Sequence, residues 1–109
     1  MNRKERRKQQ KQEKRAQRTN PAVRGLLQKA RTNFEAGNLD KAEKGFREVS
    51  RLDPLDAEAF HMRALIAYRN GRLEEAGEMI LEAITRDDKD VAIHANCGAI
   101  MNLLGRSLE

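Results

Sequence analysis

The chain has 109 residues, 39% of them hydrophobic, which is enough for one small domain. Its net charge of +5 is concentrated at one end: residues 1–20 hold nine of the 22 Lys and Arg and two of the 17 Asp and Glu (net +7), and the rest hold 13 and 15 (net −2). No apolar stretch has the length of a membrane span or of a secretory signal, and the single Cys97 cannot form an internal disulfide. We therefore expect a cytoplasmic protein with no membrane partner.

The first predicted element is a basic tail, residues 1–20. Up to residue 18 it has no Gly, no Pro and almost no apolar side chain. If it is helical, a positive stripe runs along it that could follow phosphate groups of a nucleic acid, made of Arg3, Arg7, Lys11, Arg15 and Arg18, with Lys14 beside Arg15. The tail has no aromatic residue for base stacking and no apolar face for a membrane. The alternative, which we prefer, is a disordered, solubilising leader.

The folded domain is predicted at residues 21–109 and is entirely helical. Asn20 and Pro21 mark a helix start, and the apolar residues that follow recur at intervals of three and four, with no strand pattern. We expect helices near 22–36, 39–52, 56–69, 73–86 and 90–104. Glycine tolerates positive φ, so each helix-ending glycine is expected to allow a tight turn: Gly37, Gly71 and Gly105.

A repeated phrase organises this domain. It occurs as AGNLDKA at 36–42, as NGRLEEA at 70–76 and, incompletely, as LGRSLE at 104–109, with a period of 34 residues. Other positions recur in the same register: Ala30, Ala64 and Gly98 as small residues, Ala42 with Ala76, and Phe46 with Ile80. The pattern, which includes the ending Leu52-Asp53-Pro54, resembles the tetratricopeptide repeat, a family of stacked helical hairpins. The resemblance implies an all-α, tandem helix-turn-helix solenoid of two full repeats and a partial third.

The third unit differs from the other two. Its helix is apolar nearly all round, from Val91 and Ile93 to Leu103 and Leu104, and such a helix needs cover. A terminal repeat normally has a polar outer face. The sequence therefore suggests a truncated array and self-association through the uncovered C-terminal helix.

The resemblance also implies where a partner binds. In this family the first helix of each hairpin lines a concave face that holds a protein segment or peptide. The corresponding residues have i, i+4, i+7 spacing in each first helix: Leu27, Arg31 and Phe34; His61, Leu65 and Tyr68; Ala95, Ala99 and Asn102. Family members that grip chaperone tails use Lys, Asn and Arg at slots that here hold Leu27, Met62 and Ala92, which argues against that ligand.

The sequence shows no group of residues typical of a catalytic site. His94 and Cys97 are close along one helix, but no carboxylate or glycine-rich anion site accompanies them. No metal cluster and no nucleotide motif is present, so we expect no cofactor. The leading hypothesis is a non-enzymatic interaction scaffold. One alternative is the N-terminal arm of a larger glycosyltransferase or sulfotransferase, because HANCGAIMNLLGRSLE is similar to repeat arms of some bacterial transferases. Another is an RNA- or ribosome-associated protein that binds through its tail.

Overall fold

The computed structural model describes residues 2–8 and 21–108, with side chains as far as Gly105. Residues 3–8 are helical, and Arg3 and Arg7 are exposed on this short segment. The other predicted tail residues, Lys11, Lys14, Arg15 and Arg18, lie outside the described residues. The positive stripe therefore remains a prediction.

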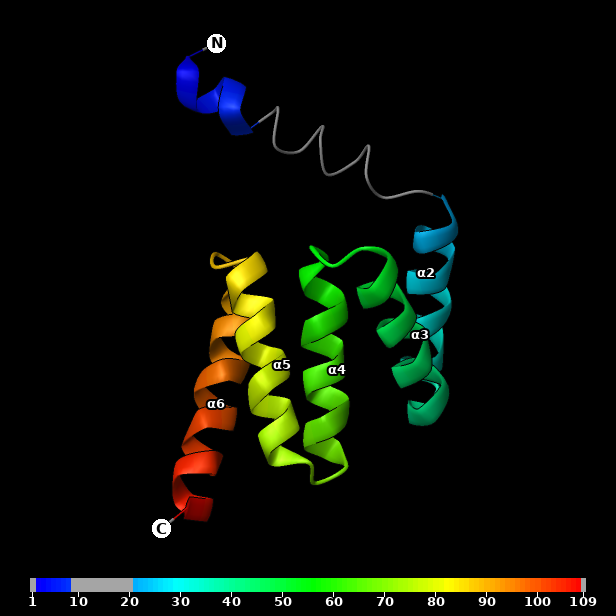
Figure 1. The fold of residues 1–109 in the computed structure, drawn as a ribbon, viewed down its shortest axis with the longest axis vertical. Coiled ribbons are helices and arrows are strands. Elements are labelled where there is room, and N and C mark those ends of the chain that lie inside the picture. Colours follow the sequence, from blue (N-terminus) through cyan, green and yellow to red (C-terminus); the bar gives the residue numbers. More distant parts are fainter. Residues whose placement is uncertain (1, 9–20, 109) are drawn as a thin grey trace.

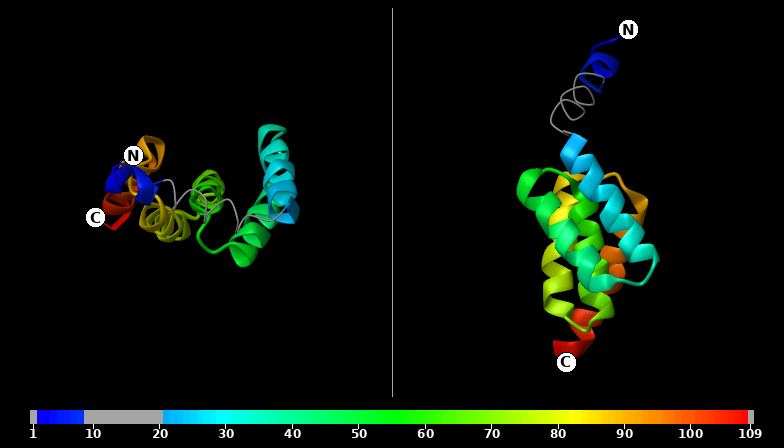
Figure 2. Two further views of the ribbon diagram at one scale, coloured as in Figure 1. Left: turned by 90° about the horizontal axis from the view of Figure 1, so that it is seen from above. Right: turned by 90° about the vertical axis from the view of Figure 1, so that its right-hand side faces the viewer.

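Residues 21–108 form a row of five helices: α2 (Pro21–Glu35), α3 (Leu39–Leu52), α4 (Ala57–Arg69), α5 (Leu73–Arg86) and α6 (Val91–Leu108). Each helix packs mainly against the helices before and after it in sequence (Figure 1). Seen from above, the row forms an arc with α2, α4 and α6 along one side and α3 and α5 along the other (Figure 2). The predicted all-α array of hairpins is confirmed, and every helix except α6 ends within one residue of its expected end.

Two of the three predicted turn glycines adopt positive φ. The angle is 82° at Gly37 and 77° at Gly71, and each turn is closed by a backbone bond, from Asn38 N to Asn33 O (2.8 Å) and from Arg72 N to Ala67 O (2.9 Å). The prediction for Gly105 is wrong, because α6 continues through it to Leu108. At Gly37 and Gly71 the following helix packs back on its partner and stabilises the turn. No such helix follows Gly105 within the described residues, and continuing α6 satisfies the backbone hydrogen-bonding groups there instead.

The core consists of two clusters that share α4. One cluster joins α2 and α3 to α4 through Ala59 and Ile66, around the fully buried Phe46. The other joins α4 to α5 and α6 through Phe60, Ala64 and Ala67. Because α4 packs on both sides, its sequence AEAFHMRALIAYR is apolar on more than one face. Stacking of successive units therefore builds one continuous core.

The small residues of the repeat permit close helix approach, as predicted. Ala30 and Ala64 are buried. At Gly45 of α3, a Cβ atom would lie 2.9 Å from the Cβ of Ala30, so α2 and α3 are in near backbone contact there. The third counterpart, Gly98, is exposed and has nothing within 4 Å of the place where its Cβ would be.

Helix α6 is covered on one side only. Ile93 and Ile100 are buried against α5, whereas Val91 is 81% exposed. Between residues 91 and 105 the helix has no charged side chain. The described part of α6 therefore presents an uncharged surface, and self-association through it remains a prediction.

Candidate functional site: the inner face

The predicted binding residues belong to α2, α4 and α6, the helices on one side of the arc (Figure 2). We call the side of the arc that these three helices form the inner face. Three contacts cross it from one helix to the next, and they fix how the neighbouring side chains are arranged.

The first contact is an ion pair between α2 and α4. The Arg31 guanidinium donates two hydrogen bonds to the Glu58 carboxylate, one of them from Nε to Oε2 at 2.5 Å. This fork geometry is the most directional form of an Arg–carboxylate pair. The hydrogen bond to Glu58 raises the pKa of Arg31, although burial opposes the shift. Both side chains remain partly exposed, so the pair orients Arg31 more than it stabilises the fold.

The second contact joins the same two helices further along. The guanidinium carbon of Arg69 lies 4.6 Å from the centre of the Phe34 ring, a cation–π contact. Tyr68 precedes Arg69 at the end of α4 and is 44% exposed, so its ring and hydroxyl are accessible to a partner.

The third contact joins α4 to α6. The Asn96 Nδ2 atom lies 2.8 Å from His61 Nε2. An amide nitrogen is a donor, so His61 Nε2 accepts and the imidazole is neutral in this arrangement. Burial lowers the pKa of His61, opposed by the negative charges of Asp90 and Glu58. Burial and the hydrogen bond thus favour the same protonation state.

All but one of the predicted residues are at least partly exposed. Arg31, Phe34, His61 and Leu65 are partly exposed. Tyr68 is exposed, as are the residues of α6: Ala95, Ala99 and Asn102. Leu27 is only 6% exposed and belongs to the cluster around Phe46, because its side of α2 turns toward α3 and α4. The prediction that Leu27 lines the surface is therefore corrected: it supports the face from beneath.

One residue that fixes the inner face was not predicted. Glu58 holds Arg31, yet it is not among the residues that the repeat pattern predicts for this face. Its signal was available, because a residue in the first helix of one unit and a residue at the start of the first helix of the next become neighbours in a stack, and here they have opposite charge.

His94, which the sequence places near Cys97, makes a contact of its own in the structure. The His94 ring donates from Nε2 to the Asp88 carbonyl oxygen at 2.5 Å, so it is engaged in the turn before α6. Within residues 2–8 and 21–105, no three His, Cys, Asp or Glu side chains group together as metal ligands. No helix in the described part of the chain is long and apolar enough to cross a membrane.

Comparison with known proteins agrees with this architecture. Among solved structures, the tetratricopeptide-repeat domain of Arabidopsis OM64 superposes with a TM-score of 0.72 over 78% of this chain and 70% of that one, at 20% sequence identity, which supports the fold alone. No curated protein matches the chain. The family model "Tetratricopeptide repeat" matches residues 27–91, more than half of the sequence. The chain therefore belongs to the tetratricopeptide-repeat family.

Proposed function

We propose that the protein is an interaction scaffold whose inner face binds an extended peptide or protein segment. The repeat fold supports a role in protein interaction in general. The observation behind the more specific proposal is the set of three contacts that cross the inner face and hold its side chains in place before any partner arrives. Preorganised side chains lower the entropy cost of binding.

The chemistry of this face favours a partner with apolar side chains. Arg31 and Glu58 neutralise each other, and Arg69 lies over Phe34. The remaining residues toward α6 are uncharged: Leu65, Tyr68, Ala95, Ala99 and Asn102. Asn102 and the Tyr68 hydroxyl add hydrogen-bonding groups, which suit the backbone of an extended peptide.

A matched pair of substitutions tests the inner face. Tyr68 and Leu81 are both large, apolar in part and about half exposed, but Leu81 lies on α5 on the opposite side of the array. Peptides selected from a random library on the intact chain should bind about tenfold more weakly to Tyr68→Ala. Leu81→Ala should leave their affinity unchanged. Equal affinity for both variants, or a library that yields no binder, would reject the proposal.

The two alternatives remain hypotheses. A transferase arm would present an acceptor protein on the same inner face, so downstream coding sequence separates it from an independent scaffold. An RNA-associated protein would bind through the tail. Filter binding to RNA by the full chain and by a chain without residues 2–18 tests that idea, because binding by charge alone should fall steeply with salt and be lost on deletion.

A further inference from the structure

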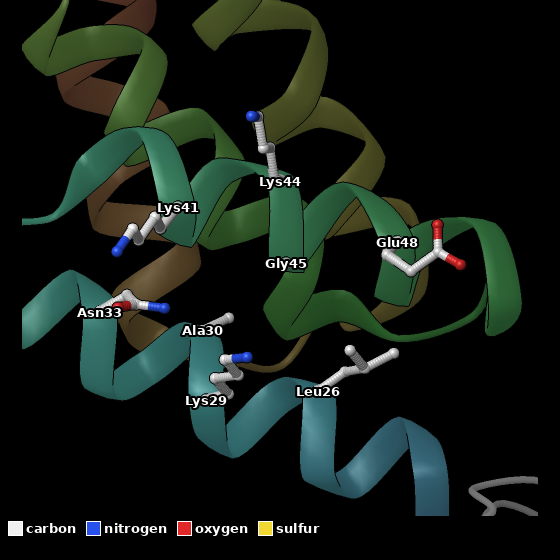
Figure 3. A pocket seen from close by; sticks show the side chains of 8 residues that line it. All are labelled: Leu26, Lys29, Ala30, Asn33, Lys41, Lys44, Gly45 and Glu48. Carbon is white, nitrogen blue, oxygen red and sulfur yellow. The ribbon is translucent and has the colours of Figure 1, made fainter.

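A second surface lies at the N-terminal end of the array, away from the inner face. It is a groove of about 410 Å³ between α2 and α3, on the side of this hairpin that faces away from α4, α5 and α6 (Figure 3). Leu26, Ala30 and Gly45 form its apolar floor, and Lys29, Lys41 and Lys44 surround it.

The corresponding groove in the next unit is already occupied, and the occupant is a helix. Adding 34 to each number gives Phe60, Arg63 and Glu75 on α4 and α5. Helix α3 packs on this side: Arg47 lies 3.4 Å from Glu75, and Glu43 pairs with Arg72. The protein itself thus demonstrates that this type of groove accepts an amphipathic helix.

The charges of the two grooves differ, and the difference specifies the occupant. Glu75, which pairs with Arg47 of α3, has Lys41 as its counterpart in the open groove. Glu78 likewise has Lys44 as its counterpart. A helix placed like α3 would therefore need an acidic residue in place of Arg47. Lys29 is the counterpart of Arg63, which the negative charge of Glu43 on α3 influences. Glu43 is one helical turn from Arg47, so the docked helix needs a second acidic residue one turn from the first.

The lysines are available for such a partner. None of Lys29, Lys41 and Lys44 forms an ion pair within the described part of the chain. The one acidic side chain of the groove, Glu48, is already paired with Arg51, which lowers its pKa. The groove is therefore positive overall, around an apolar floor.

Two other occupants fit less well: the basic tail of this chain and a second copy of the chain. The tail at residues 1–20 has a net charge of +7, which the lysines would repel. A second copy could offer the acidic helix α5, but α6 already packs on the side of α5 that corresponds to the docking side of α3, with Leu104 over Gly77. A different protein is the occupant that fits.

We propose that the groove between α2 and α3 binds an acidic amphipathic helix of a partner protein. The helix presents Asp or Glu at i and i+4 to the lysines and an apolar residue to Leu26. The basic tail precedes α2 directly in sequence and adds to the attraction of an acidic partner at long range.

The test uses the intact chain and a defined probe. The probe is a lactam-bridged helical peptide of about 14 residues, long enough to span roughly four turns, with Glu at i and i+4 and Leu on the adjoining stripe. The control peptide has Gln in place of both Glu. Fluorescence anisotropy should show that Lys41→Glu and Lys44→Glu each weaken binding of the Glu peptide by about tenfold or more. The matched control Lys89→Glu reverses an exposed lysine in the turn before α6 and should leave binding unchanged.

Folding does not confound this comparison. Lys41 and Lys44 are exposed, and Lys41→Glu places a negative charge in the first turn of α3, where it interacts favourably with the helix dipole. Tyr68→Ala should also leave binding of the probe unchanged, which separates this surface from the inner face. The proposal is overturned if Lys41→Glu behaves like Lys89→Glu, if the Gln peptide binds as tightly as the Glu peptide, or if neither binds. It is equally overturned if sedimentation shows that the groove mediates pairing of two copies, with association lost in Lys41→Glu.

Discussion

The first hairpin, α2 with α3, and the second, α4 with α5, follow the same 34-residue pattern but have different surroundings. Phe60 of the second hairpin is buried beneath Arg63 and Arg86, whose guanidinium carbons lie 5.4 and 4.0 Å from the ring centre. Its counterpart Leu26 is partly exposed beside the lysines of the open groove. Equivalent residues of the two hairpins therefore have different surroundings, although they occupy the same place within the repeat.

The largest expected effect tests whether the two hairpins fold as one unit. Phe46 and Ile80 are equivalent and fully buried, one in each core cluster. Phe46→Ala should destabilise the fold by about 3–5 kcal/mol and Ile80→Ala by about 2–5 kcal/mol. Because α4 belongs to both clusters, each substitution should lower a single thermal transition measured by circular dichroism. Two separate transitions would show that the hairpins unfold independently.

A pair of glycines compares the rigid packing inside the first hairpin with the packing of α5 on α6. At Gly45 a new Cβ would meet the Cβ of Ala30, which cannot rotate away. Gly45→Ala should therefore cost about 1–3 kcal/mol. At Gly77 the new Cβ would lie 2.6 Å from the end of Leu104, which can rotate, and at ordinary contact distance, 3.5 Å, from the end of Met101. Gly77→Ala should be neutral or stabilise by up to about 1 kcal/mol, the helix-propensity gain. Urea unfolding measures both, and the reverse order would contradict the packing described here.

A smaller effect concerns how the units are joined. Asp56 caps α4 by accepting a hydrogen bond from Ala59 N at 2.9 Å, and Asp90 caps α6 in the same way from Ile93 N at 3.1 Å. Asp56 is the more buried of the two. Asp56→Ala should cost about 1–2 kcal/mol and Asp90→Ala about 0.5–1 kcal/mol. Chemical denaturation of the two variants checks the order, and an equal loss would mean that position in the stack does not matter for the caps.

The smallest effect is a pH dependence at the junction of the second and third units. The folded pKa of His61 is lowered, so as pH falls the unfolded chain, with an ordinary value of about 6.5, takes up the proton first. The stability from neutral His61 is therefore complete above about pH 6.5 and is lost as pH falls toward the folded pKa. His61→Gln should lose less stability between about pH 7 and pH 5 than the unmodified chain. An identical loss in thermal melts would remove His61 as the cause.

Self-association gives a further comparison, between the covered α4 and the half-covered α6. Sedimentation velocity over increasing concentration should show dimers or larger species, since contiguous uncharged surface promotes association. Val91→Lys places a charge on the most exposed apolar residue of α6 and should reduce the association. A monomer at every concentration would contradict the prediction.

Features set by the period of the repeat could be predicted from the sequence. The helices, the turns at Gly37 and Gly71 and the small residues Ala30 and Ala64 each depend on a neighbour within one hairpin, so spacing is enough to find them. Features that depend on the neighbouring unit were harder. Gly105 has the same local sequence cue as Gly71, but α6 continues through it, and Leu27 has the spacing of a surface residue but turns into the core.

The inner face and the open groove were also hard to predict, because both depend on the neighbouring unit. Arg31 and Glu58 are 27 positions apart and meet only when two hairpins stack, so their opposite charges suggest the pair but spacing within one hairpin does not reveal it. Lys29 is the counterpart of Arg63 in the next unit. Its meaning depends on knowing that this side of the first hairpin has no described helix packed on it, whereas the same side of the second hairpin has α3.

The charges between α3 and α5 have a mechanical consequence. Glu43, Arg47, Glu75 and Arg72 form a closed ring of alternating sign, with two links inside the helices and their turn (3.2 Å and 2.7 Å) and two between the hairpins. Arg31 and Glu58 join the same two hairpins through α2 and α4. Bending the array in either direction must stretch one of these linkages, so the first two hairpins should respond to a pulling force as one stiff segment. The corresponding polar contact between α4 and α6 is the hydrogen bond between His61 and Asn96, which is weaker than these ion pairs. The array should therefore bend most easily where α6 joins it.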